Sequence, residues 1–384
     1  MNLKRFWIFI LLASAVGLLL TEMAQAQTAS LQTKVSEQKN EKIKALEGTW
    51  NIRLRNFRYE DDLNQRNTAE FRLLTDLRYR PLENIDFRLA PKFTYTNGFV
   101  QTTEGSQAAT STWGMKEASI NAEPFSDIWL SAGALDQSKD HPALLLDEQA
   151  FPAARLRMQT DSQALLSAGI KGETAIPTNS SLSAETKELE ETPTYSSGSV
   201  FLKLQKMAVE GQFQAGVYEF QNLPSSLATK SAYFGNSITP IGEKESVFTY
   251  EYKGSFAAVN LKTHMGRYLT LKTLGEWVKN EQAPKDFNQA VRSNIGLEMN
   301  LSQNVQLTPY YEYFRIEPDA AVSYYNGVWL NTNRIGYDTG LSFAYKKTLK
   351  LTASGGERNV IFESDKQKSE RTWIFKIETF EVAI

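Results

Sequence analysis

The chain has 384 residues, of which 42 are Lys or Arg and 44 are Asp or Glu, so its formal net charge is −2. This near-neutral balance argues against nucleic-acid binding. The absence of cysteine excludes disulfide bonds as a source of stability.

Residues 1–26 have the three parts of a secretory signal peptide. Lys4 and Arg5 precede an apolar run over residues 6–20, and Ala24 and Ala26 frame a small-residue cleavage site. The run is short and its downstream flank is polar, so we expect cleavage and not an uncleaved membrane anchor. Beyond residue 26, no stretch approaches the ~20 apolar residues of a membrane helix. The mature chain is therefore expected outside the cytoplasm.

Residues 27–47 are polar and contain few large apolar residues. Leu31, Val35, Ile43 and Leu46 do not keep a clean heptad spacing. Two interpretations remain open for this leader. It is either a disordered or weakly helical periplasmic segment, or a short coiled coil that helps barrels to trimerise.

The strongest pattern is an alternation of apolar and polar residues between positions 292 and 316. Leu297 and Tyr311 belong to its apolar set, and Glu298 and Asn300 belong to its polar set. A period of two places each set on one face of a strand. With a short turn at 302–304, the pattern predicts a hairpin with one apolar and one polar face.

Similar segments recur from residue 48 to the end of the chain, and we predict about sixteen strands, within a range of 14–18. Besides the hairpin, they cover residues 49–59, 68–80, 85–96, 115–122, 128–135, 153–160, 164–172, 199–206, 208–220, 247–262, 269–279, 335–346, 349–358 and 372–382. In residues 247–262, Lys253–Ser255 could form a turn, but a single strand keeps the up–down order. An even number of strands returns both termini of the chain to the periplasm.

An exported chain of short alternating segments predicts an all-β, transmembrane antiparallel barrel over residues 48–384. Lipid cannot satisfy backbone N–H and C=O groups, so a membrane sheet must close on itself. A soluble sandwich or solenoid also alternates. It would not, however, alternate short turns, such as 302–304, with long loops, such as 136–152 and 317–334.

From Trp50 to the C-terminus the chain therefore resembles Gram-negative outer-membrane porins in architecture. The resemblance implies an outer-membrane location, lipid and the barrel-insertion machinery as partners, and a homotrimer as one arrangement. It departs from porins at the end, where Trp373 and Phe375 share one face but Val382 and Ile384 share the other. A bulge near Thr379 would reconcile the two registers.

The loop at 135–152 has three consecutive leucines at 144–146 between charged flanks. In porins, the loop after the fifth strand folds into the lumen and narrows the pore, and this loop follows the fifth predicted strand. The alternative is that it packs on neighbouring loops at the barrel mouth. The acidic residues of the loop are Asp136, Asp140, Asp147 and Glu148.

The inward faces of predicted strands one, two, three and six are rich in cations. The candidates for pore lining are Arg53, Arg55, Arg72, Arg78, Arg88, Lys92, Arg155 and Arg157, together with the four loop acids. Glu70, Asp76, Asp86 and Glu117 offset part of this charge. The pattern favours a weak preference for anions, because rings of charge set ion preference. The alternative is a lumen plugged by groups that pair with each other.

We therefore expect a passive diffusion channel for small hydrophilic solutes, not an enzyme, with no cofactor or metal site. Two other functions remain open: a structural or adhesive barrel with a blocked lumen, and a barrel hydrolase that uses His141 beside Asp140. No nucleophile motif or metal-spaced histidine pair supports the hydrolase.

Overall fold

The computed structural model describes residues 46–61, 65–102, 105–106, 110–160, 164–178, 189–206, 208–242, 245–327 and 330–383. The expected signal peptide and all but the last two residues of the leader lie outside the described residues. Residues 46 and 47 already belong to the first strand.

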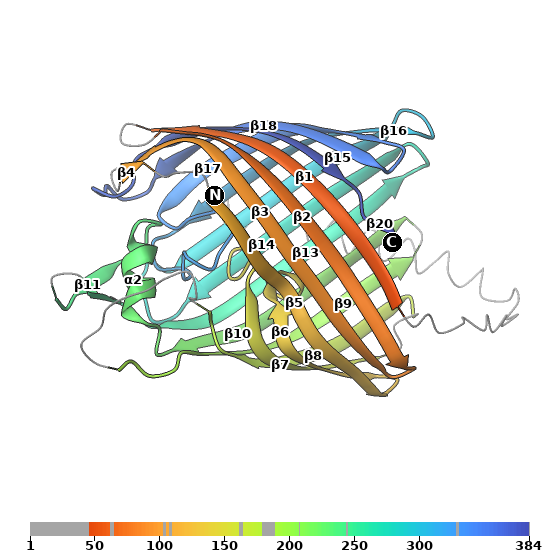
Figure 1. Cartoon of the computed structure of the whole chain (residues 1–384), viewed down its shortest axis with the longest axis horizontal. Helices are drawn as coiled ribbons and strands as arrows, with labels where there is room; N and C mark the ends of the chain where they lie inside the picture. Colours follow the sequence, from red (N-terminus) through yellow and green to blue (C-terminus); the bar gives the residue numbers. More distant parts are fainter. Residues whose placement is uncertain are drawn as a thin grey trace, which may run out of the picture. The chain divides into compact units, whose positions relative to one another are not determined.

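The described chain forms a closed antiparallel barrel of sixteen strands (Figure 1). Each strand pairs with its neighbours along the chain, and the last strand pairs with the first, which leaves no open edge. The strands are β1 (Leu46–Glu60), β2 (Gln65–Leu82), β3 (Ile85–Thr102), β5 (Thr110–Phe125), β6 (Ile128–Asp136), β7 (Ala150–Gln159), β8 (Leu166–Ala175), β9 (Thr194–Lys206), β10 (Val209–Gln221), β13 (Tyr252–Met265), β14 (Leu269–Asn280), β15 (Gln289–Asn300), β16 (Val305–Ile316), β17 (Arg334–Tyr345), β18 (Leu349–Val360) and β19 (Glu370–Thr379).

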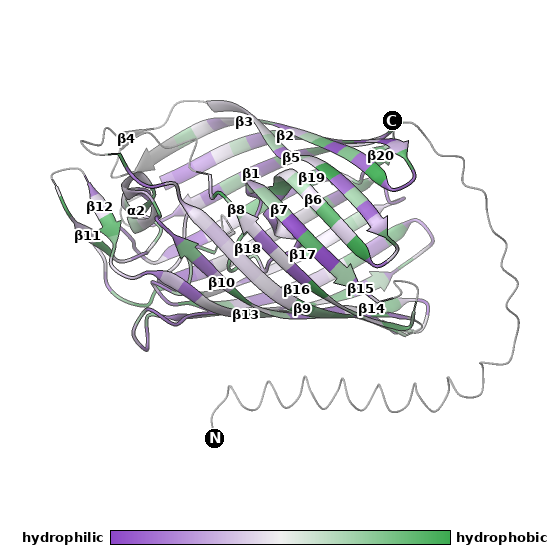
Figure 2. Cartoon of the chain, turned by 90° about the horizontal axis from the view of Figure 1, so that it is seen from below, coloured by the Kyte–Doolittle hydropathy of each residue, from purple (hydrophilic) through white to green (hydrophobic). Residues whose placement is uncertain are grey.

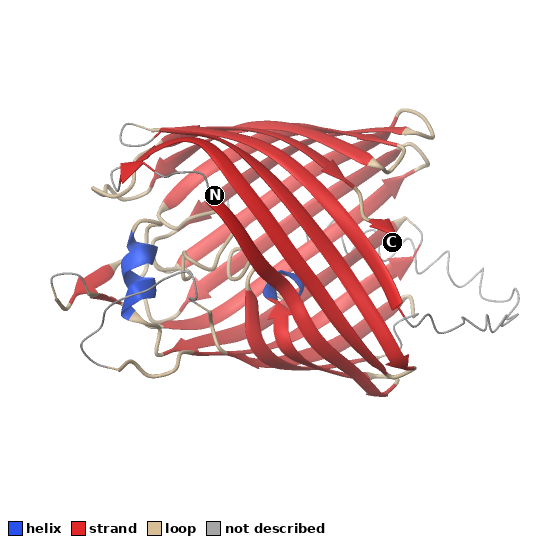
Figure 3. Cartoon of the chain, viewed as in Figure 1, coloured by secondary structure: helices blue, strands red, loops and turns tan. Residues whose placement is uncertain are grey.

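Four short strands and two helices complete the described secondary structure (Figure 3). β4 (Gly105–Ser106) extends the wall beside β3, and β11 (Ile238–Pro240) pairs with β12 (Ser246–Phe248) in a separate ribbon. The helices are η1 (Gln137–Lys139), a single 3₁₀ turn, and α2 (Ser225–Ala232). Neither helix is long and apolar enough to cross a membrane.

The outer surface of the barrel is apolar, as the alternation predicts. On β15 and β16, Ile295 is 49% exposed and Tyr311 is 47% exposed, whereas Glu298 points inward and forms an ion pair with Lys272. Figure 2 shows the alternation as hydrophobic and hydrophilic residues that succeed each other along the strands. A surface of this kind suits lipid outside and polar groups inside.

The predicted all-β barrel, its sixteen strands and its alternation of short turns with long loops are confirmed. We call the two ends the short-turn end, where β15 turns into β16, and the long-loop end, which carries α2. Within residues 247–262 the prediction was partly wrong. The barrel strand β13 does run through residues 253–255, but it begins at Tyr252, and Val247 and Phe248 belong to β12.

The end of the chain contains the register change that the sequence suggested. β19 pairs with β1 as far as Glu378, opposite Arg53. β20 (Val382–Ala383) pairs with β1 again, but one residue out of that register, with Val382 opposite Trp50. Between β19 and β20, the Thr379 side-chain oxygen accepts a hydrogen bond from the Ile52 N–H at 2.9 Å. This contact spans the gap in the backbone pairing with β1.

The largest apolar core lies inside the barrel at the long-loop end. On β10, Val217 faces outward and is 62% exposed, whereas Tyr218 and Phe220 face inward and are buried. These inward residues belong to one cluster with inward residues of β7–β9 and β13–β16, with Leu227 of α2, and with residues of the loops that follow β6 and β16. The members of this interior cluster include Leu144, Leu145, Leu146, Phe151, Tyr195, Tyr218, Phe220, Leu227, Tyr252, Phe256, Val278, Phe314, Ile316, Ala320, Ala321, Val322, Tyr325 and Leu330.

Candidate pore and constriction site

The loop at residues 137–149, called the crossing loop from here on, passes through the lumen. At one side, the Arg72 guanidinium of β2 contacts Glu148 at 2.8 Å. At the other, the Ala143 N–H donates to the Glu276 carboxylate of β14 at 3.1 Å. β2 and β14 lie on opposite sides of the sixteen-strand ring. The loop therefore spans the barrel instead of packing at its mouth.

The middle of the crossing loop is anchored by apolar contacts and by a second loop. Leu144, Leu145 and Leu146 have no exposed surface and belong to the interior cluster. The Asp147 N–H donates to the Tyr325 carbonyl at 2.9 Å, and the Gly327 N–H donates to the Ala143 carbonyl at 2.9 Å. The leucine run, which is unusual in an exposed loop, thus has a packing explanation.

Glu148 connects the crossing loop to the basic wall of the first three strands. Arg53 and Arg72 lie directly opposite each other on β1 and β2. Glu148 accepts two hydrogen bonds from Arg72 Nη1, at 2.8 and 2.9 Å, and lies 4.0 Å from Arg53 and 3.9 Å from Lys92. Burial opposes its ionisation, but Arg72, Lys92 and Arg53 outweigh that effect and hold the pKa of Glu148 below its usual range.

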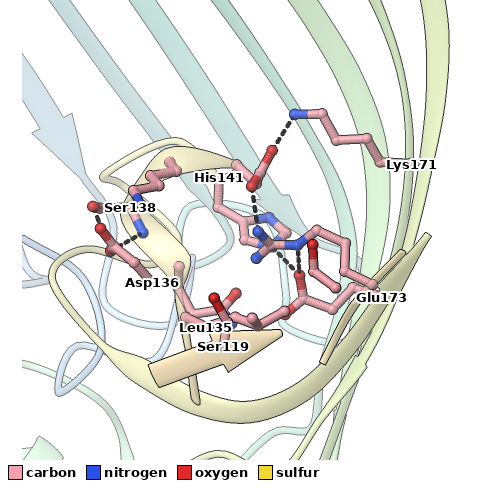
Figure 4. A network of polar contacts seen from close by, with 12 residues as sticks. Ser119, Leu135, Asp136, Ser138, His141, Lys171 and Glu173 are labelled. Atoms are coloured by element: carbon pink, nitrogen blue, oxygen red, sulfur yellow. Dashed lines mark hydrogen bonds and ion pairs between the residues drawn. The ribbon is translucent and has the colours of Figure 1, made fainter. Parts of the chain in front are cut away.

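A second ion-pair network joins the crossing loop to β7 and β8 (Figure 4). Asp140 contacts Lys171 at 2.6 Å and also contacts Arg155, whose guanidinium binds Glu173 at 2.5 Å. Although burial opposes ionisation, Arg155 and Lys171 lower the pKa of Asp140. The imidazole of His141 is buried beside the same network, 3.9 Å from Glu173.

The remaining predicted loop acids have other neighbours. Asp136 is buried and accepts hydrogen bonds from Ser138 N and Oγ, at 3.1 and 2.7 Å, so it caps η1 and also pairs with Lys116 at 3.4 Å. Asp147 has no ion pair within the described residues. Burial, and next the charge of Glu148, raises its pKa to about 6.

Most of the predicted basic residues are also paired. Arg55 binds Glu70 at 2.7 Å, Arg78 binds Asp86 at 2.6 Å, and Arg88 binds Asp76 and, at 3.6 Å, Glu117. Of the eight predicted cations, only Arg157 has no carboxylate within ion-pair distance among the described residues; its guanidinium donates to the Gln159 side chain instead. The excess of cations in the sequence is therefore largely neutralised.

Two cavities open between the crossing loop and the wall of β1–β9. The smaller one, about 110 Å³, lies between β1–β5 and the first turn of the loop. The larger one, about 880 Å³, extends toward the short-turn end. It is lined by residues that include Arg78, Arg88, Trp129, Lys139, Asp140, Arg155, Arg157, Lys203 and Gln205.

Several charged residues of the lumen were not among the predicted candidates. They are Lys116, Lys139, Lys171, Glu173, Lys203, Glu276, Arg292 and Glu312. Those on strands, except Lys116, occupy inward positions of the same alternation, which therefore contained the signal for them. Lys116 lies beside the inward Glu117, at a register shift between β5 and β3 that the alternation does not reveal. Lys139, in contrast, lies in η1, where no strand period applies.

The geometry around His141 does not support the alternative of an Asp–His base that the sequence left open. Asp140 directs its carboxylate to Arg155 and Lys171. The ring nitrogens of His141 lie 3.3 and 3.5 Å from the Tyr195 hydroxyl, and the ring packs edge-on against Phe256. Among the described residues, the contacts of His141 with Tyr195, Phe256 and Glu173 thus involve no serine or threonine hydroxyl that could act as a nucleophile.

Solved structures show the same fold. OprB of Pseudomonas putida, in its high-pH structure, has 10% sequence identity and a TM-score of 0.60, with 88% of this chain and 94% of that chain covered. The fold is that of an outer-membrane porin. OmpF of Salmonella typhi, in complex with daunomycin, has 8% identity and a TM-score of 0.50 over 88% of this chain and 97% of that one.

An outer-membrane protein of Vibrio cholerae, OmpT with loop L8 deleted, has 9% identity and a TM-score of 0.50 over 88% of this chain and 99% of that one. No protein-family model matches the chain, and no curated protein matches its sequence. The architectural resemblance to porins is therefore confirmed at the level of the fold.

Proposed function

We propose that this protein lies in the outer membrane of a Gram-negative bacterium and conducts small hydrophilic solutes by passive diffusion. The observation that carries the proposal is the combination of an apolar outer surface with a cavity of about 880 Å³, lined by charged residues, inside a sixteen-strand barrel. Barrels of this size leave an aqueous lumen unless loops fill it. The short turns would face the periplasm and the long loops the outside.

We further propose that the predicted pore-lining residues give only a weak preference for anions. Seven of the eight cations are paired with carboxylates, and Glu148 supplies a negative charge to the wall of β1–β3. A wide, hydrated lumen also screens charge over about 8–10 Å. Selectivity would therefore be a bias in permeation and not a filter.

One observation favours a second candidate function, a barrel with a blocked lumen. The interior cluster fills the long-loop end beside β7–β10 and β13–β16, and the loops that follow β6 and β16 contribute to it. A conducting path would pass beside this cluster, along the wall of β1–β6 and β17–β19. Single-channel recording in planar lipid bilayers decides between the two functions, because a blocked barrel shows no unitary conductance steps.

A matched variant sharpens that experiment. Leu144→Ala with Leu145→Ala removes apolar volume from the centre of the crossing loop, whereas Leu130→Ala removes it from the outer wall, where Leu130 is exposed. If the protein is a channel, the wild-type protein conducts, and the loop variant conducts more. Conductance that appears only in the loop variant would support the blocked barrel.

A homotrimer is part of the same proposal. The apolar outer surface suits contact with lipid or with a second barrel equally well. Three conductance steps of equal size per insertion, and a threefold mass by light scattering in detergent after subtraction of the detergent, would support a trimer. A single step with a monomer mass would contradict it.

A further inference from the structure

We propose that Arg157 and Lys203 form a binding subsite for a small oxyanion with two negative charges, in the cavity at the short-turn end. Phosphate and dicarboxylates share this chemistry. The subsite extends the proposed channel function. Only a role of the subsite in transport depends on that proposed function. Its existence can be tested without conduction.

The subsite is built around an inward-facing aromatic ring. Phe201 lies on β9 opposite Gly169 of β8, and a side chain on Gly169 would collide with the ring. Three cations surround this ring: Arg157 at 4.9 Å from its centre, Lys171 at 5.1 Å and Lys203 at 5.7 Å. Phe201 itself is 1% exposed, so these cations cover it from the lumen side. Three positive charges thus lie around one neutral aromatic ring.

The carboxylates nearby neutralise only part of this charge. Asp140 uses one oxygen for Arg155 and the other for Lys171, and Glu173 is bound to Arg155. Arg157 and Lys203 have no ion pair among the residues that the structure describes. Two positive charges thus remain without a counter-ion among the described residues, on β7 and β9 at either side of β8, and both residues line the larger cavity. A dianion would match them in charge.

Arg157 is held in place for such a ligand. Its guanidinium lies over Phe201 and, at 5.7 Å, near the ring of Trp129, and it donates to Gln159. Contact with aromatic rings orients a guanidinium without neutralising it. Its Nε is buried and has no hydrogen-bond partner in the structure. Because Nε has almost no accessible surface, an oxyanion in the cavity would bind the terminal nitrogens of the guanidinium and not Nε.

The remaining wall of the cavity suits a polar ligand. Gln205 follows Lys203 at the next inward position of β9 and lines the same cavity. Its amide can donate to an oxygen, as the Lys203 ammonium can. The cavity has ample room for a hydrated oxyanion. The geometry therefore combines fixed donors, uncompensated charge and space.

The test is isothermal titration calorimetry on the folded, detergent-solubilised barrel at pH 7.5 and constant ionic strength. The titrants are sodium phosphate, sodium succinate and sodium chloride. We expect saturable binding of phosphate, of succinate or of both, with chloride at least about tenfold weaker. Binding of only one of the two dianions supports the subsite and identifies the class of ligand that it takes. No saturable binding of either dianion, or chloride binding of equal strength, would overturn the proposal.

Variants locate the subsite. Arg157→Gln with Lys203→Gln is expected to weaken dianion binding by about tenfold or more, since the double variant removes both charged hydrogen-bond donors of the subsite. The control Arg78→Gln removes a cation of the same cavity that is already paired with Asp86 at 2.6 Å, so binding should persist. Unchanged binding in the double variant, or equal loss in the control, contradicts the assignment.

Heat-modifiable migration on gels shows whether each variant is folded. If the double variant does not fold, Lys203→Gln alone serves, with Arg157→Lys as the charge-preserving partner that should still bind. The two proposals can fail separately. Conductance without dianion binding overturns the subsite and leaves the channel, whereas binding without conductance overturns the channel and leaves the subsite.

Discussion

The Glu148 carboxylate accepts two hydrogen bonds from Arg72 Nη1, across the space between the crossing loop and β2. Glu148 adopts a positive φ of 46°, a conformation that non-glycine residues rarely occupy. The backbone is thus held in an unfavourable region while the side chain meets Arg72, Arg53 and Lys92. This arrangement links the position of the loop to the charge of the wall.

Replacing Glu148 by Gln should make the channel more selective for anions. The change removes the one negative charge shared by three cations, while the size of the side chain is kept. We expect the reversal potential under a KCl gradient to shift toward the chloride equilibrium potential. Glu191→Gln, in an exposed segment at the long-loop end, serves as the control and should leave the potential unchanged. A shift toward potassium would contradict this role of Glu148.

The double variant Arg53→Ala, Arg155→Ala should shift the reversal potential the other way. Arg53 lies 3.2 Å from Glu378, and Arg155 binds Glu173, so their removal leaves carboxylates without partners in the lumen. We expect a modest gain in cation permeation because the hydrated lumen screens charge over about 8–10 Å. Arg371→Ala, at a largely exposed position, is the matched control. An unchanged potential in the double variant would exclude both arginines from the conducting path.

The two faces of β15 should respond differently to a new charge. Ile295 lies near the middle of the strand and faces outward, so Ile295→Arg should lower the free energy of unfolding by about 2–4 kcal/mol. Glu298→Arg places the same group in the lumen and should cost much less. Urea unfolding of the barrel in lipid vesicles, followed by tryptophan fluorescence, measures both. Equal costs would mean that the outward face is wrongly assigned.

The pH dependence of stability should contain a contribution from Asp147. Because burial and Glu148 raise its folded-state pKa to about 6, ionisation of Asp147 opposes folding. Its unfavourable contribution is absent below about pH 4, the ordinary range of Asp, and is complete above pH 6. The melting temperature of wild type should therefore fall between pH 5 and pH 7.5 relative to that of Asp147→Asn. Parallel curves for the two proteins would contradict the raised pKa.

The strands could be predicted because lipid and lumen impose opposite polarity on neighbouring residues. The same rule placed Arg53 and Arg157 on the inward face. It could not predict that Arg53 meets Glu378, since this pair depends on closure between the first and last strands. It also misjudges the long-loop end, where inward positions such as Tyr218 and Phe220 are apolar because two loops fill the lumen beside them.

The predicted surplus of cations shows a second limit of sequence reasoning. Counting the inward residues of a few strands gives the number of charges on that part of the barrel wall, but not which of these charges form ion pairs. Lys171 and Glu173 of β8, which were not counted, join Asp140 and Arg155 in one network. Only the register between strands and the path of the loop decide which charges are left over.

Arg53 lies at the seam where β1 meets β19, with Glu378 of the last strand on one side and Glu148 of the crossing loop on the other. During synthesis, β1 is translated long before β19. Until β19 pairs with β1, Arg53 lacks its contact with Glu378. The closing pair of strands β1 and β19 thus completes the set of charges around Arg53, which contacts the crossing loop through Glu148.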